Sequence, residues 1–191
     1  KGSSNTGDRR SLMGYPWPDG MSREPLRLLL VYYYFPPRGG VAVQRVVKLI
    51  KYLAEHDVED AVVTSPGDYE RLRDETLASE LPPSCRVHRT SEDTRAIEGQ
   101  FRRSRSVDAF ASWVQPAIQL AREVIAQWSP DVLLTTSPPH SQQQIGLSLS
   151  KVLPWVVDFR DPWTHDPRWR LRAGRLARVR NERLEQATLR R

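Results

Sequence analysis

Short apolar runs alternate with amphipathic stretches along this chain, and this alternation constrains the fold more than any other feature. Five runs have the length and composition of strands: residues 26–35, 61–65, 85–89, 131–136 and 153–157. The stretches between them place apolar residues at helical spacing. Strands that alternate with helices of this size form parallel sheets with right-handed crossovers. The sequence therefore predicts an α/β fold with a single Rossmann-like, doubly wound parallel sheet, in the strand order 3-2-1-4-5.

The length of 191 residues fits one domain, and we expect a loose tail at 1–25 and the domain at 26–191. No run approaches the ~20 apolar residues of a membrane helix, and the first residues lack the apolar centre of a signal peptide. A cytoplasmic location is the expectation. Cys85 is the only cysteine and the four histidines are scattered, so we expect no disulfide, metal or cofactor.

The positive charge is concentrated at the carboxyl end. The net charge is +6, and residues 168–191 contain nine arginines against Glu182 and Glu185. Such a helix could bind anionic lipid at the inner face of the membrane, or it could be a solvated basic face. Nucleic acid is not expected as a partner, because no aromatic residue for base stacking follows Trp169.

A charged motif, Asp158-Phe-Arg-Asp-Pro-Trp163, directly follows the fifth apolar run. Ligands of open α/β sheets bind at the carboxyl ends of the strands, where this motif would lie. Two interpretations remain open. In one, Arg160 bridges the carboxylates of Asp158 and Asp161 as a structural network. In the other, the motif is a ligand site, in which one carboxylate orients a hydroxyl while Arg160 positions a phosphate or the partner carboxylate. Trp163 would stack on a flat face of the ligand or pack against the last helix.

The loop after the first strand does not carry a dinucleotide fingerprint. Its sequence, Pro-Pro-Arg-Gly-Gly-Val-Ala-Val, differs from G-x-G-x-x-G, and the chain contains no G-x-x-x-x-G-K-[ST]. Gly39 and Gly40 nevertheless permit an anion to approach the amino end of the following helix. The alternative is a turn that needs glycine only for its positive φ.

Three strand-end loops together resemble the amino-terminal domain of the family 4 glycosyltransferases, which have the GT-B fold. They are Tyr33-Tyr-Phe-Pro-Pro-Arg-Gly-Gly40, Thr136-Ser-Pro-Pro-His-Ser141 and the motif at 158–163. The resemblance covers about residues 26–191. It implies a retaining enzyme without a cofactor, which transfers a sugar from a nucleotide sugar to the hydroxyl of a sugar or lipid-linked acceptor, in the synthesis of bacterial surface polysaccharides or glycoconjugates.

The same resemblance implies roles for single residues. Gly39, Gly40 and Arg38 would bind the donor diphosphate. The catalytic residues would be His140, Asp158 and Asp161, and the acceptor would contact His140, Ser141, Arg160 and Trp163. The donor-binding domain of the family does not follow Arg191 in this sequence, so we expect the isolated chain to be inactive. The alternative is a non-catalytic solitary domain that binds an acidic partner through its arginine-rich helix.

Overall fold

A computed structural model describes residues 24–67, 72–91, 107–167, 171 and 173–191. Almost all of the expected tail at 1–25 lies outside these residues. Five parallel strands form one sheet: β1 (Leu26–Val31), β2 (Val58–Thr64), β3 (Arg86–Arg89), β4 (Val132–Ser137) and β5 (Trp155–Phe159). The main helices are α1 (Val41–Leu53), α2 (Thr76–Ser79), α4 (Val114–Trp128), α5 (Gln143–Leu149) and α7 (Arg175–Leu189). The strand order, β3-β2-β1-β4-β5, is the predicted one.

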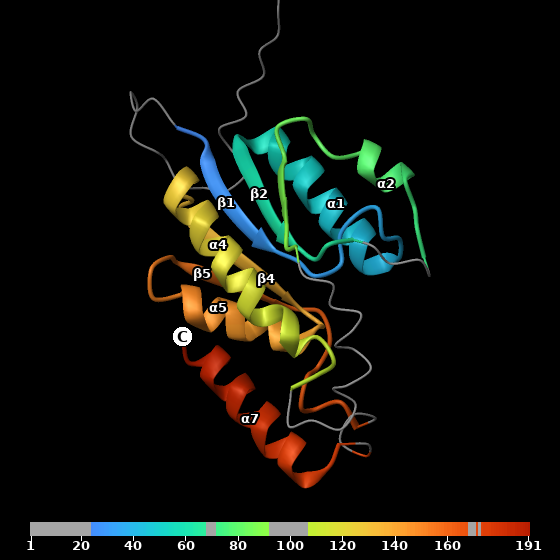
Figure 1. The fold of residues 1–191 in the computed structure, drawn as a ribbon, viewed down its shortest axis with the longest axis vertical. Coiled ribbons are helices and arrows are strands. Elements are labelled where there is room, and N and C mark those ends of the chain that lie inside the picture. Colours follow the sequence, from blue (N-terminus) through green and yellow to red (C-terminus); the bar gives the residue numbers. More distant parts are fainter. Residues whose placement is uncertain (1–23, 68–71, 92–106, 168–170, 172) are drawn as a thin grey trace, which may run out of the picture.

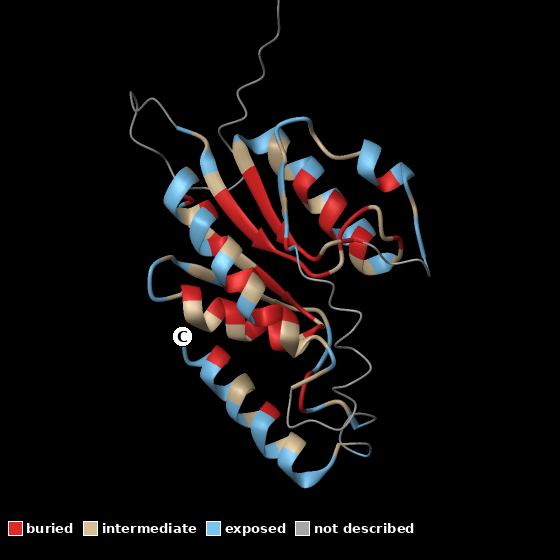
Figure 2. Ribbon diagram, in the orientation of Figure 1, coloured by how far each residue is buried: buried red, intermediate tan, exposed pale blue. Residues whose placement is uncertain are grey.

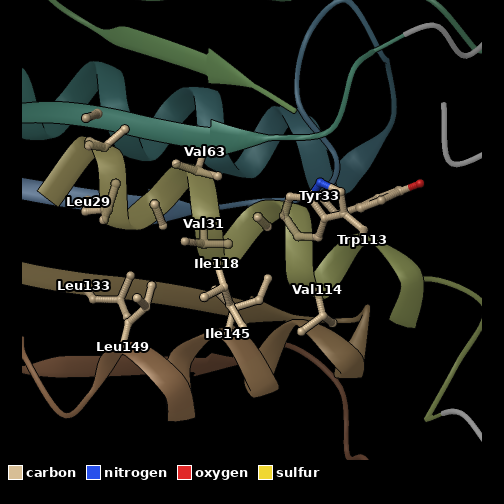
Figure 3. Packing of buried hydrophobic residues seen from close by; sticks show 14 residues of the cluster. Leu29, Val31, Tyr33, Val63, Trp113, Val114, Ile118, Leu133, Ile145 and Leu149 are labelled. Carbon is tan, nitrogen blue, oxygen red and sulfur yellow. The ribbon is translucent and has the colours of Figure 1, made fainter. Parts of the chain in front are cut away.

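Helices cover both faces of the sheet (Figures 1 and 2). On one face, Val46 and Ile50 of α1 pack on even-numbered residues of β1 and β2. On the other face, α4 and α5 enclose the larger apolar cluster, which includes Leu29, Ile118 and Ile145 (Figure 3). The helix α7 packs on the outside of α5. The α/β, doubly wound prediction is confirmed, and it follows from strands that are apolar on both faces.

Several elements differ from their predicted limits: β2 begins at Val58, before the apolar run at 61–65, and β5 extends to Phe159 and so includes Asp158 of the charged motif. β1 ends at Val31, although the apolar run continues to Phe35, because the Tyr33 amide leaves the sheet ladder and donates to a side chain. The helix expected to start near residue 107 begins at Val114, after a short 3-10 turn at Ala111–Trp113. Pro116 then lies in the first turn of α4, where a missing amide hydrogen costs nothing.

Asp60 is a buried carboxylate inside β2, and it gives a pH-dependent prediction. It is 2% exposed, its Oδ1 has no partner, and burial raises its pKa from 3.8 to about 7. The folded chain therefore holds a proton that the unfolded chain loses near pH 4. The contribution of Asp60 to stability should be greatest below pH 4 and should be lost as the pH rises to about 7, a loss of up to roughly 4 kcal/mol at about 1.4 kcal/mol per pKa unit.

The neutral variant Asp60→Asn tests this prediction. Urea unfolding should show a variant close to wild type at pH 4.5 and clearly more stable than wild type at pH 8. Glu59→Gln, on the neighbouring and more exposed position with its Arg86 partner at 3.4 Å, is the matched control and should not reproduce the gain. Equal pH dependence of wild type and Asp60→Asn would contradict the assignment.

Candidate functional site

The side-chain amide of Gln142 holds β1 and β4 apart at their carboxyl ends. The Tyr33 amide donates to Gln142 Oε1 at 2.9 Å, and Gln142 Nε2 donates to the carbonyls of Thr136 at 2.8 Å and Val31 at 2.7 Å. Gln142 is fully buried. The amide thus stands between two strands that would otherwise continue to pair. This is the switch point of the sheet, where β1 and β4 lead to opposite faces, and where ligands of such folds bind.

A row of polar side chains lies near the carboxyl ends of β4 and β5, on the face of the sheet that α1 covers. Thr136 and Asp158 are register partners, and Thr136 Oγ1 donates to Asp158 Oδ2 at 3.0 Å. Arg45 of α1 reaches the other carboxylate oxygen, with 2.9 Å between its Nη2 and Asp158 Oδ1. The Tyr32 hydroxyl faces Thr136 without a hydrogen bond of good geometry, and burial raises its pKa. Four elements thus meet at one carboxylate.

Arg160 does not bridge the carboxylates of Asp158 and Asp161, so this interpretation of the 158–163 motif is wrong. Arg160 donates through Nη2 to the Pro138 carbonyl and through its amide to the Ser137 carbonyl. It therefore ties the loop after β5 to the loop after β4, while Arg45 neutralises Asp158. Asp161 is exposed, and no hydrogen bond or ion pair of its side chain occurs within the described part of the chain. Of the two predicted catalytic carboxylates, one is paired and the other faces solvent.

His140 lies flat against Trp163, with ring centroids 4.6 Å apart and an interplanar angle of 5°. Burial lowers the pKa of His140, so its imidazole is neutral at neutral pH, and its Nδ1 is buried without a partner. Trp163 is only 2% exposed and donates to Asn181 Oδ1 of α7 at 2.8 Å. Trp163 is too deeply buried to stack on a sugar, so that expected role is wrong. Its other expected role, packing against the last helix, is confirmed. Trp163 orients His140 instead.

The amino end of the helix after β4 is capped by Asp108, a residue from a distant part of the sequence. Ser141 and Gln144 have the spacing of a capping box, but the Ser141 amide donates to Asp108 Oδ2 at 2.8 Å. Asp108 also accepts from the Phe110 amide at 2.9 Å. The amino end of this helix is thus already occupied by a carboxylate of the chain. Ser141 Oγ is buried and has no hydrogen-bond partner.

The amino end of α1 has no such cap. Gly40 is its first flanking residue, with φ 108°, and neither a capping side chain nor an acidic residue lies in the first turn. The Gly39 amide already donates to the Leu72 carbonyl at 2.8 Å, so it is not free to donate to an anion. Of the two glycines, only Gly40 could bind an anion through its amide, together with the amides that follow it. The Arg38 guanidinium lies over the Tyr34 ring, 4.3 Å from its centroid.

Buried polar atoms without partners gather at this same edge. They are Tyr32 Oη, Ser137 Oγ, His140 Nδ1, Ser141 Oγ and Arg160 Nε, all at the ends of β1, β4 and β5. Buried polar groups are normally hydrogen-bonded, and the exceptions need an explanation. A ligand or bound water with both donors and acceptors would satisfy this set. The arrangement is suited to a polyhydroxylated molecule.

Sequence reasoning missed several residues that build the site. Gln142 and Asp108 carry no local signal, because each bonds to segments more than 30 positions away. Arg45 was assigned to the polar face of its helix, and Asn181 to an arginine-rich surface. Trp169 was considered for sugar stacking and lies outside the described residues.

No three His, Cys, Asp or Glu side chains in the described part of the chain come together as a metal site. None of the described helices is long and apolar enough to cross a membrane.

Comparisons with known proteins give a likeness of fold. No family model matches the chain, and no curated protein matches it. Among solved structures, the sucrose-phosphate synthase of Thermosynechococcus elongatus is 13% identical with a TM-score of 0.55, over 86% of this chain and 40% of that one. The apo UGT2 of Phytolacca americana is 12% identical with a TM-score of 0.52, over 78% and 34%. The glycosyltransferase SnogD of Streptomyces nogalater is 21% identical with a TM-score of 0.49, over 84% and 40%.

This chain thus spans well under half the length of these neighbours. At such identities the likeness concerns the fold, and it agrees with the five-stranded, Rossmann-like sheet described above.

Proposed function

We propose that this chain is the acceptor-binding domain of a retaining, family 4-like glycosyltransferase, which moves a sugar from a nucleotide sugar to an acceptor hydroxyl. The observation that carries the proposal is the set of buried, unpartnered polar atoms at the carboxyl edge of β1, β4 and β5. Hydroxyl groups both donate and accept, and a sugar presents several of them. Four of these atoms, in Ser137, His140, Ser141 and Arg160, come from two of the three loops that resemble the family, 136–141 and 158–163.

His140 is the residue we place against the acceptor. Its pKa is lowered by burial, so at neutral pH it is uncharged and can accept a hydroxyl proton. The stack on Trp163 fixes the plane of the imidazole. Ser141 Oγ, in the loop after β4, and Arg160 Nε, in the loop after β5, are the other buried, unpartnered atoms that we assign to the acceptor. The donor diphosphate would lie at the uncapped amino end of α1, beside Gly40.

A transfer assay on the full-length gene product, with a panel of nucleotide sugars and bacterial glycan or lipid-linked acceptors, tests this function. His140→Gln should lower turnover about 100-fold, the scale of one proton-transfer group, with little change in melting temperature. His88→Gln is the matched control, because burial also lowers the pKa of this β3 histidine. Full turnover in His140→Gln would contradict the role of His140, and no turnover with any donor would contradict the proposal.

The arginine-rich helix does not favour the alternative of a lipid-binding solitary domain. Through Asn181 and Glu185, α7 bonds to Trp163 and Thr164 in the loop after β5. Its buried side chains thus support the candidate site. A role in bacterial polysaccharide synthesis remains part of the proposal, and the bacterial glycan acceptors of the panel test it. A peripheral membrane contact is also part of the proposal, and transfer to the lipid-linked acceptors of the panel would support it.

A further inference from the structure

Arg45 is a half-exposed cation with a single partner in the described part of the chain. Its side chain is 54% exposed, whereas that of Asp158 is 20% exposed. One Nη2 donor is used by Asp158 Oδ1 at 2.9 Å. A guanidinium has five N–H donors in a planar fork, a shape that fits phosphate oxygens. Most of this fork is therefore available to a ligand.

The position of Arg45 places its charge at the mouth of the site. It lies one helical turn after Val41, the first residue of α1, and both are exposed. Side chains of a helix lean toward its amino end, and here that end opens on the carboxyl edge of the sheet. The guanidinium and the uncapped amides of the first turn thus belong to the same corner, and both favour an anion.

The neighbourhood also contains a buried group that lacks a partner. Tyr32 is 2% exposed, its hydroxyl has no hydrogen bond, and Asp158, Arg45 and Arg160 all act on it electrostatically. A hydroxyl in this position can donate to an oxygen that enters beside Arg45. This unpartnered hydroxyl is a second observation, independent of the amino end of α1, that indicates a ligand beside Thr136 and Asp158.

We propose that Arg45 contacts a phosphate group of the ligand and that Asp158 is its counter-ion until the phosphate arrives. The proposal rests on the proposed function in that the phosphate is the diphosphate of a nucleotide sugar. Partly exposed ion pairs are weak, and a phosphate offers more charge and a bidentate contact. The exchange frees one oxygen of Asp158, while Thr136 keeps the other in place.

Binding of inorganic pyrophosphate to the chain, measured by calorimetry in EDTA, tests the exchange. Arg45→Gln should weaken binding about tenfold, the effect of losing one charged hydrogen-bonded contact. Asp158→Asn should strengthen binding by roughly threefold or more, because a repelling charge and a competitor for Arg45 are removed. The opposite signs matter, since a purely structural ion pair predicts the same loss from both variants.

Lys48→Gln and Glu80→Gln remove an ion pair between α1 and the residue that follows α2, and they serve as matched controls that should leave affinity unchanged. Thermal melting identifies variants that fail to fold, and Arg45→Lys, which keeps the charge without the fork, should give an intermediate affinity. Unchanged affinity in Arg45→Gln, a loss in Asp158→Asn, or no binding by wild type would overturn the inference.

The two proposals fail in different ways. If only the proposed function is wrong, pyrophosphate still binds in an Arg45-dependent way and no sugar is transferred. If only the Arg45 inference is wrong, the full-length protein transfers sugar, and Arg45→Gln leaves both turnover and pyrophosphate affinity unchanged.

Discussion

Replacing Gln142 by leucine should destabilise the fold on the order of 3–5 kcal/mol, although the two side chains have similar size. The variant removes hydrogen bonds to the Tyr33 amide and the Thr136 carbonyl in a fully buried place. Each buried polar group left without its partner costs about 1–3 kcal/mol. Chemical denaturation followed by circular dichroism gives the free energy of unfolding directly.

Gln144→Leu is the matched control for this change. Gln144 lies two positions further on the same helix, is half-buried, and makes no side-chain hydrogen bond within the described residues. It should lose less than about 0.5 kcal/mol, as surface substitutions do. A Gln142→Leu variant as stable as the control would show that β1 and β4 re-pair without the amide.

The second large effect is expected for Trp163→Ala. The indole is almost fully buried and holds α7 through Asn181, and truncation of a buried tryptophan costs about 3–5 kcal/mol. The loss of its ring also exposes His140 to water on one face. Since burial is the main cause that lowers the pKa of His140, this pKa should rise toward the ordinary value of about 6.5.

Trp163→Phe separates the two roles of this residue. It keeps an aromatic face for His140 and loses only the Asn181 hydrogen bond, at about 1 kcal/mol. Denaturation measures the stability, and a proton NMR titration of the imidazole measures the pKa. A pKa of His140 that stays unchanged in Trp163→Ala would show that the tryptophan does not shield the imidazole.

The sheet could be predicted from the sequence because its signals are local. The run Leu28 to Val31 is apolar on both faces, α1 has a clear helical period, and Pro36 and Gly40 separate them. Parallel pairing of such strands then leaves few topologies. The edge at which His140, Gly40 and Asp158 lie follows from the same rules, because His140 and Gly40 come after strand ends and Asp158 lies near the carboxyl end of β5.

The internal contacts of the site could not be predicted in this way. Which cation neutralises Asp158 depends on how far α1 is rotated on the sheet, and the sequence suggested only Arg160, its neighbour in the motif. The burial of Trp163 depends on α7, whose arginines suggested a free surface. Such partnerships are set by tertiary packing, and no periodicity within a single segment encodes them.

The bonds that complete the site connect parts of the chain that are far apart in the sequence. Tyr33 and Gln142 are 109 positions apart, and Asn181 donates to the Val107 carbonyl across 74 positions at 3.4 Å. Contacts with such separation carry a large loop-closure entropy and are slow to form. A nascent chain that has made β1, α1 and β2 therefore contains two of the five strands and none of the environment of His140. The candidate site is therefore a late product of folding, and it is complete only when α7 has docked.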